Sequence, residues 1–132
     1  MISQEFPLAS WFLLVNVAVF LFVYALPLTF APLRWARWFR WPLPSGSTDL
    51  TVYLARCVGM LALAIIAMAV QAVPDPRGHR MVFELIAWAT GFMVPLHVWG
   101  ALRRTQPWTE TLEIALYAAV CAGSSSICLR LA

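Results

Sequence analysis

The sequence predicts an all-α, polytopic membrane protein in which four transmembrane helices form an antiparallel bundle. Hydrophobic residues make up 62% of the 132 residues and charged residues only 11%, whereas soluble domains hold roughly 45 to 50% apolar and 25% charged residues. The apolar residues also form four stretches, each close to the ~20 residues that a helix needs to cross a ~30 Å hydrocarbon core. The whole chain, residues 1–132, is therefore expected to be a single transmembrane domain.

The four predicted helices cover about residues 8–30, 50–73, 81–102 and 109–132. Pro27 is expected to kink or end the first helix and Pro95 to disturb the third, because proline removes a backbone donor and clashes with the preceding turn. Short segments rich in turn-forming residues separate the helices. Four crossings place both ends of the chain on the same side of the membrane.

Between the first two helices, the stretch RWARWFRW is expected to form a short amphipathic segment at the membrane interface. At 100° per residue its aromatic rings separate from its guanidinium groups, which suits rings at the acyl boundary and Arg at lipid phosphates. The expected interfacial anchor consists of Arg34, Trp35, Arg37, Trp38, Arg40 and Trp41. Beside a membrane span, this pattern does not favour binding to nucleic acid.

Basic residues predict the orientation of the chain. The first and third connections carry five Arg residues, against three on the other side, so the positive-inside rule places these connections in the cytoplasm and both termini outside. All nine basic residues are Arg, which we interpret as a GC-rich bacterial coding bias. The expected location is the bacterial inner membrane.

The last predicted helix carries a narrow polar stripe, whose members fall within roughly 80° of one another on a helix. The stripe consists of Glu110, Glu113, Tyr117, Cys121, Ser124 and Cys128. Bare polar groups are costly in hydrocarbon, so the stripe is expected to face protein, a ligand or a water-filled cavity.

Three ionisable residues are expected at similar depth near the cytoplasmic face, namely Arg56, His97 and Glu113. Two interpretations stay open. In the first, Glu110 and Glu113 offset the positive end of the helix dipole, while Arg56 forms a structural ion pair or reaches to the interface. In the second, Arg56, His97 and Glu113 form a polar pocket that binds a small molecule.

Glu84 lies near the opposite face of the membrane. We expect Arg80 or Arg77 to satisfy its charge, and the alternative is a second proton or cation site. His97 and His79 would lie ~27 Å apart along one helix, too far to share one haem iron, and His97 has no metal-binding spacing with a carboxylate. We therefore expect no metal and no cofactor, while a quinone, a lipid or a haem shared between two chains stays open.

Small residues at four-residue spacing predict helix contacts, because they let helix backbones approach closely in lipid. They are Ala55 and Gly59 on the second helix, and Ala115, Ala119 and Gly123 on the fourth. The expected partners are membrane lipids and either other membrane subunits or a second copy of the chain. The sequence contains no nucleophile motif, phosphate-binding loop or paired catalytic carboxylates, so no catalytic residue is predicted and an enzyme is not favoured.

The runs ARCVGMLALAIIAMAV (Ala55 to Val70) and PRGHRMVFELIAW (Pro76 to Trp88) resemble the middle of small four-helix bacterial membrane proteins of the DoxX-like and uncharacterised DUF type. This resemblance in pattern implies the fold and carries no catalytic signature. The expected function is that of a non-catalytic accessory or scaffold subunit in a larger membrane complex, such as a respiratory or photosynthetic one. The alternative is a protein that binds or moves a quinone, lipid or cation through the polar cluster.

Overall fold

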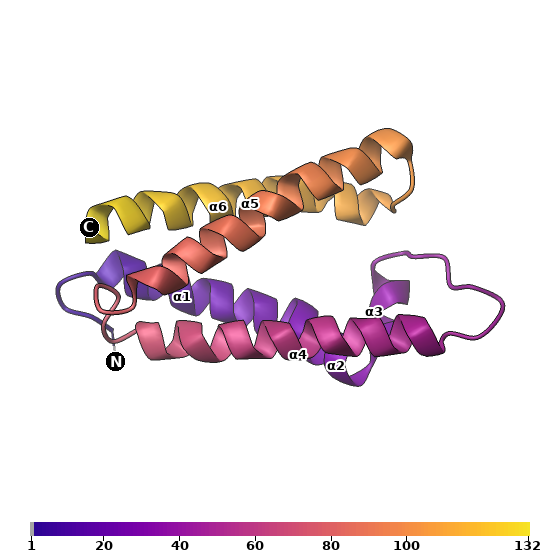
Figure 1. Ribbon diagram of the computed structural model, residues 1–132, viewed down its shortest axis with the longest axis horizontal. Coiled ribbons are helices and arrows are strands. Elements are labelled where there is room, and N and C mark those ends of the chain that lie inside the picture. Colours follow the sequence, from indigo (N-terminus) through magenta and orange to yellow (C-terminus); the bar gives the residue numbers. More distant parts are fainter. Residues whose placement is uncertain (1) are drawn as a thin grey trace.

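The computed structural model describes residues 2–132 and confirms the all-α prediction. Four helical spans are long and apolar enough to cross a membrane: Pro7–Phe30, Asp49–Ala72, Arg80–Arg103 and Trp108–Leu131. Each begins and ends within one residue of its predicted bounds. The spans run up and down in chain order, so the first span begins at the same end of the molecule at which the last one finishes (Figure 1). The chain is therefore built as a multi-pass membrane protein.

The spans pair as two hairpins (Figure 1). The first hairpin combines α1 (Pro7–Phe20) and α2 (Leu26–Phe30) with α4 (Asp49–Ala72), and the second combines α5 (Arg80–Arg103) with α6 (Trp108–Leu131). The hairpins pack together where α1 begins and α6 ends, and they separate toward the other end. There, α3 (Pro32–Trp38) and the segment after it stand between them.

The first span departs from a regular α-helix near its proline. A π-helical segment, η1 (Leu21–Ala25), joins α1 to α2, so the span does not end at Pro27. Pro27 has no N–H to donate to the carbonyl of Val23 four residues earlier. That carbonyl instead accepts a hydrogen bond from the indole N–H of Trp35 at 2.8 Å, so the chain itself supplies the donor that a membrane span requires. The third span, α5, runs unbroken through Pro95.

The predicted interfacial segment forms α3 and the turn after it. Arg34, Arg37, Trp38 and Arg40 are exposed, as an interfacial anchor requires. Trp35 instead faces the bundle, where its ring stacks on that of Phe39 with centroids 4.5 Å apart. Arg40 adopts a left-handed conformation with φ 62°, and the next N–H, of Trp41, donates to the carbonyl of Ala36. This turn directs Trp41 toward the second hairpin.

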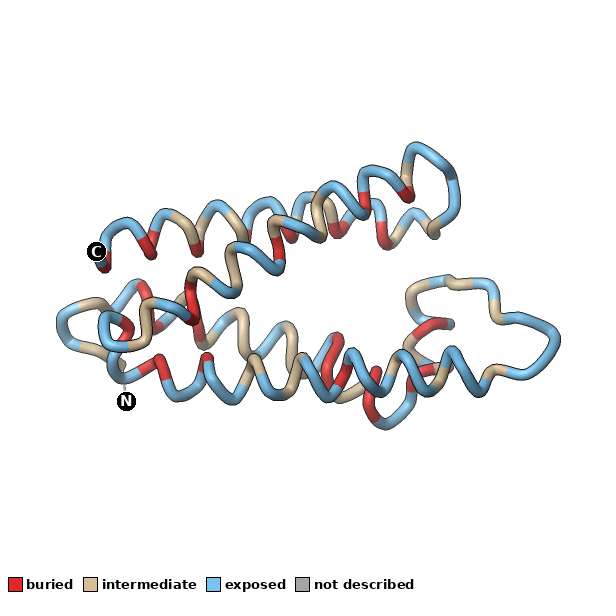
Figure 2. Tube along the Cα trace, viewed as in Figure 1, coloured by how far each residue is buried: buried red, intermediate tan, exposed pale blue. Residues whose placement is uncertain are grey.

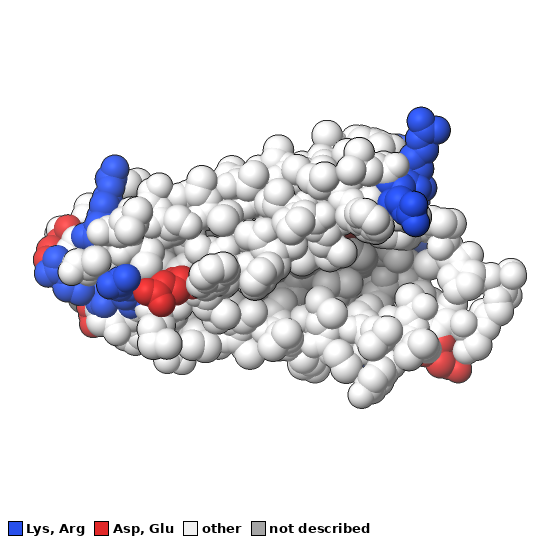
Figure 3. Space-filling model, turned by 45° about the horizontal axis from the view of Figure 1, so that its top comes forward, with Lys and Arg blue, Asp and Glu red and all other residues white. Residues whose placement is uncertain are grey.

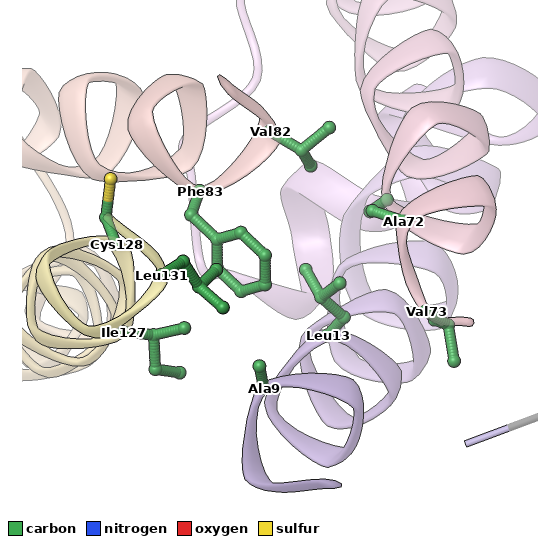
Figure 4. Packing of buried hydrophobic residues seen from close by; sticks show 10 residues of the cluster. Ala9, Leu13, Ala72, Val73, Val82, Phe83, Ile127, Cys128 and Leu131 are labelled. Carbon is green, nitrogen blue, oxygen red and sulfur yellow. The ribbon is translucent and has the colours of Figure 1, made fainter. Parts of the chain in front are cut away.

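The buried apolar core lies at the end where the hairpins meet, and all four spans contribute to it (Figure 4). Leu13 of α1 and Phe83 of α5 are fully buried. Two buried hydroxyls also join elements here: Ser10 Oγ donates to the carbonyl of Val73 at 2.6 Å, and Ser124 Oγ donates to that of Phe83 at 2.8 Å. The buried members are Ala9, Leu13, Ala69, Ala72, Val73, Val82, Phe83, Ile127, Cys128 and Leu131.

The outer surface suits a lipid environment. Figure 2 shows that the helices are exposed along most of their outward sides, and large apolar side chains such as Phe22, Met81 and Leu129 are exposed there. On the face drawn in Figure 3, the charged side chains gather toward the two ends and leave an uncharged middle. This distribution is the one that a bilayer imposes, because charge is costly in the hydrocarbon region.

Candidate functional site

Three ionisable side chains meet in the second hairpin. His97 Nε2 lies 3.3 Å from Oε2 of Glu110 and 3.6 Å from Oε2 of Glu113. All three residues are buried, with 5%, 7% and 6% of their surfaces exposed. Glu110 and Glu113 are three positions apart, which places them on one face of α6. A tight connection folds α5 back onto this face, so that His97, near the end of α5, reaches both carboxylates.

Backbone contacts fix the orientation of the imidazole ring. His97 Nδ1 lies 2.8 Å from the carbonyl oxygen of Met93, and because a carbonyl can only accept, Nδ1 carries the proton of this hydrogen bond. In a neutral ring Nε2 then carries a lone pair directed at the carboxylates. The carbonyl of His97 itself accepts from Gln106 Nε2 at 3.0 Å. With the ring neutral, the site brings together three groups that accept hydrogen bonds, and a proton or a cation between them would stabilise it.

The segment after α3 closes the site from the first hairpin. Trp41 Nε1 donates to Oε1 of Glu110 at 2.8 Å. One residue earlier in α6, Thr109 Oγ1 donates to the carbonyl of Phe39 at 2.6 Å. These two bonds join positions 69 and 70 residues apart in the chain. They tie the hairpins together at the end where their helices separate.

Two tyrosines complete the surroundings of Glu113. Tyr24 and Tyr117 are buried, and both lie close to Glu113. The ring of Tyr117 also packs on that of His97, with centroids 4.9 Å apart. Glu113 Oε1 nevertheless has no hydrogen-bond partner among the described residues. A buried carboxylate oxygen without a partner is costly, so the site has capacity to bind a further group.

An apolar cleft of about 250 Å³ lies between the hairpins next to this cluster. Its walls come from both hairpins and include Val58, Ile65, Ile86, Met93, Tyr24 and Tyr117. None of the described residues that line it is charged. Figure 3 shows that the surface is hollowed between the hairpins. Tyr117 joins the two features, since it lines the cleft and also contacts His97.

The structure brings together only part of the predicted ionisable cluster. His97 pairs with Glu113 and also with Glu110. Arg56 is exposed on α4, and no ion pair among residues 2–132 includes it. The expected contact of Arg56 with Glu113 does not form because α4 belongs to the other hairpin, which separates from α5 and α6 at this end. Glu84 pairs with Arg80 at 3.2 Å, one of the two partners that the sequence predicted for its charge.

The polar stripe on α6 faces protein, as predicted: Glu110, Glu113, Tyr117, Ser124 and Cys128 are buried, and Cys121 is half-buried. The predicted small-residue contacts divide into two groups. Gly59 packs on Thr29 of α2, and Gly123 packs on the ring of Phe12, both within the chain. Ala55 is half-buried, while Ala115 and Ala119 are exposed on the outer side of α6.

Sequence reasoning assigned Trp41 only to the interface and gave no role to Tyr24. The single hint was that Trp41 is the last aromatic residue of a segment next to the first span, with a polar indole N–H that needs a partner when buried. The place of Tyr24 depends on how the π-helical segment rotates the first span, and no local pattern predicts that rotation. Comparisons of this chain with protein-family models, with curated proteins and with solved structures found no match.

Proposed function

We propose that this protein binds a neutral amphipathic molecule of the quinone class in the cleft between its hairpins. The ring of the molecule occupies the apolar cleft, and its carbonyl oxygens accept hydrogen bonds from Tyr24 and Tyr117, which line that cleft. The observation that carries the proposal is the position of Tyr117, which lines the apolar cleft and also packs on His97 of the buried cluster. Apolar walls with a few convergent polar groups are typical of small-molecule sites.

The size and charge of the cleft support a quinone head over a charged lipid. A volume of about 250 Å³ lies just below the ~300 to 1,000 Å³ of typical ligand pockets, so it suits one ring rather than a whole phospholipid. A lipid phosphate would need a basic partner, and none of the described lining residues is basic. A quinone carbonyl needs only a donor, which a tyrosine hydroxyl supplies.

The test is binding of decylubiquinone to the protein purified in detergent, measured by calorimetry. Ala62 lies on α4 and lines the cleft. Ala62→Trp would fill the cleft with an indole ring and should therefore abolish binding. Ala64 is exposed on the same helix and does not line the cleft, so Ala64→Trp is the matched control and should bind normally. Equal affinity of the two variants, or no saturable binding by the unaltered protein, would contradict the proposal.

A second measurement addresses the head group. Tyr117→Phe removes one hydroxyl and keeps the ring, so the affinity for decylubiquinone should fall about 5- to 13-fold, the value of one hydrogen bond of ~1 to 1.5 kcal/mol. Tyr53 is exposed on α4, and Tyr53→Phe should leave the affinity unchanged. If the two tyrosine variants behave alike, the head group does not lie at Tyr117.

The predicted role as a scaffold or accessory subunit is our second candidate function. It is supported by Ala115 and Ala119, which are exposed at four-residue spacing on α6 and would let another membrane helix approach closely. Ala119→Leu should then dissociate a complex that survives purification in mild detergent. A monomeric protein without a partner under those conditions would count against this candidate.

We further propose that the site lies near the cytoplasmic face of the bacterial inner membrane. His97 lies near the end of α5, Glu110 near the start of α6 and Trp41 in the first connection. The first and third connections lie at the same end of the molecule (Figure 1) and hold five Arg residues against three on the other side. Labelling of single cysteines in the connection between α5 and α6 by a reagent that does not cross the membrane tests this orientation. Efficient labelling from outside intact cells would reverse it.

A further inference from the structure

We propose that His97, Glu110 and Glu113 form a binding site for a divalent first-row transition metal ion. This inference goes beyond the proposed function and does not depend on it, because the three donor atoms belong to the second hairpin and none of the three residues lines the apolar cleft. The site would take a metal at the boundary between that cleft and the end of the bundle.

The distances between donor atoms match a metal site. With bonds of ~2.0 to 2.2 Å from zinc to nitrogen or oxygen, two ligands of a tetrahedral site lie ~3.4 Å apart. His97 Nε2 lies 3.3 Å and 3.6 Å from oxygens of Glu110 and Glu113. One donor atom from each of the three residues lies within 4.8 Å of the others. Small rotations of the two carboxylates would therefore complete the coordination.

The charges at the site also favour a cation. Two buried carboxylates face Nε2 of an imidazole whose Nδ1 already donates to the carbonyl of Met93, so in the neutral ring the lone pairs of Nε2 and of the carboxylates face one another. Glu113 Oε1 has no hydrogen-bond partner among the described residues, and Arg56, the basic residue expected here, is exposed elsewhere. A divalent ion would neutralise both carboxylates in a region where uncompensated charge is costly.

Neighbouring hydrogen bonds already hold two of the three ligands. The Met93 carbonyl fixes the ring of His97, and the indole of Trp41 holds Glu110 through its other oxygen. Such contacts orient ligands and strengthen metal sites. One imidazole with two carboxylates suits zinc, iron, cobalt or manganese, whereas calcium and magnesium prefer oxygen ligands alone. Three protein ligands leave a further position open.

The test is titration of the full-length protein with Co²⁺, after purification without a histidine tag and treatment with a chelator. Visible absorption reports tetrahedral Co²⁺, and Zn²⁺ should displace it at one ion per chain. Glu110→Gln and Glu113→Gln keep side-chain volume and should each weaken binding by at least ~100-fold. His79→Gln and Glu84→Gln alter a histidine and a glutamate outside the site and should leave binding unchanged.

Circular dichroism and size-exclusion chromatography verify that each variant is folded. Trp41→Phe should weaken Co²⁺ binding ~10- to 100-fold, as expected when a bond to a ligand is lost, whereas Trp38→Phe, at an exposed ring, should not. Ala62→Trp fills the cleft but leaves all three metal ligands in place, so it should keep full Co²⁺ binding. Quinone binding and metal binding are therefore tested separately, and either proposal can fail without the other. Absence of stoichiometric binding, or binding that is lost in His79→Gln and kept in Glu113→Gln, would overturn the metal site.

Discussion

Gly59 is the position at which a single methyl group should disturb the first hairpin. It is buried on α4, directly against α2. A Cβ at this position would lie 2.8 Å from the backbone nitrogen of Thr29 and closer still to the hydroxyl of the same residue. Because ordinary contacts between such atoms are ~3.5 to 4.0 Å, α2 would have to move by roughly 1 Å. A backbone cannot rotate away as a flexible side chain can, so Gly59→Ala should separate the two helices.

The loss of stability caused by Gly59→Ala can be estimated by comparison with a second helical glycine. Gly91 lies within α5, and a Cβ there would meet only the Sγ of Cys121 at 3.4 Å, an ordinary contact. Both Gly→Ala changes gain about the same helix propensity, up to ~1 kcal/mol. Overpacking costs about 1 to 3 kcal/mol, and in lipid the added methyl group gains no hydrophobic transfer energy to offset it. Gly59→Ala should therefore be less stable than Gly91→Ala by about 1 to 3 kcal/mol.

The free energy of unfolding can be measured by titrating dodecylmaltoside micelles with SDS and following helix content and tryptophan fluorescence. Gly59→Ala should unfold at a lower SDS fraction than the unaltered protein, and Gly91→Ala at the same fraction or a higher one. If the two variants agree within about 0.5 kcal/mol, the close approach of α4 to α2 is not a constraint on this fold and the reasoning fails.

Two further predictions concern buried hydrogen bonds. Ser124→Ala removes the bond to the carbonyl of Phe83 and should lower the free energy of unfolding, in the same SDS titration, by about 0.6 and at most ~1.7 kcal/mol, the range found for such bonds within membranes. Trp35→Phe leaves the carbonyl of Val23 without its donor and should also destabilise the protein, but less so in combination with Pro27→Ala, which restores a backbone donor to the first span. A double-mutant cycle measures this coupling, and strictly additive effects would show that the indole does not compensate for the proline.

Much of the fold could be predicted from local features. The four spans lie within one residue of their predicted bounds, because in lipid a backbone must satisfy its own hydrogen bonds and an apolar run of sufficient length does so as a helix. Pro27 shows where this reasoning stops. A kink or an end of the helix was expected there. The span does not end, and its α-helix is interrupted by a π-helical segment in which the carbonyl of Val23 is satisfied by Trp35, a residue in a different element.

The candidate site was predictable only in part. Helical periodicity placed Glu110, Glu113 and Tyr117 on one buried face of α6, and the short connection between α5 and α6 brought His97 to them. The expected pairing with Arg56 does not occur, because depth along a helix does not determine which side of the helix faces the bundle. The predictions that a metal and a cofactor are absent rested on spacing along the chain, and residues from two helices can converge without such spacing.

By itself, the sequence determined the number and length of the spans, their up-and-down order and the inward direction of the polar stripe, since these follow from hydrocarbon thickness and helical period. Only the tertiary structure decided that the spans pair as two hairpins, that a cleft remains between them, and that Trp41 reaches Glu110 from 69 residues away. The reason is that lipid satisfies apolar side chains as well as protein does. Helix association therefore depends on close packing and on a few hydrogen bonds, which become defined only when the helices are side by side.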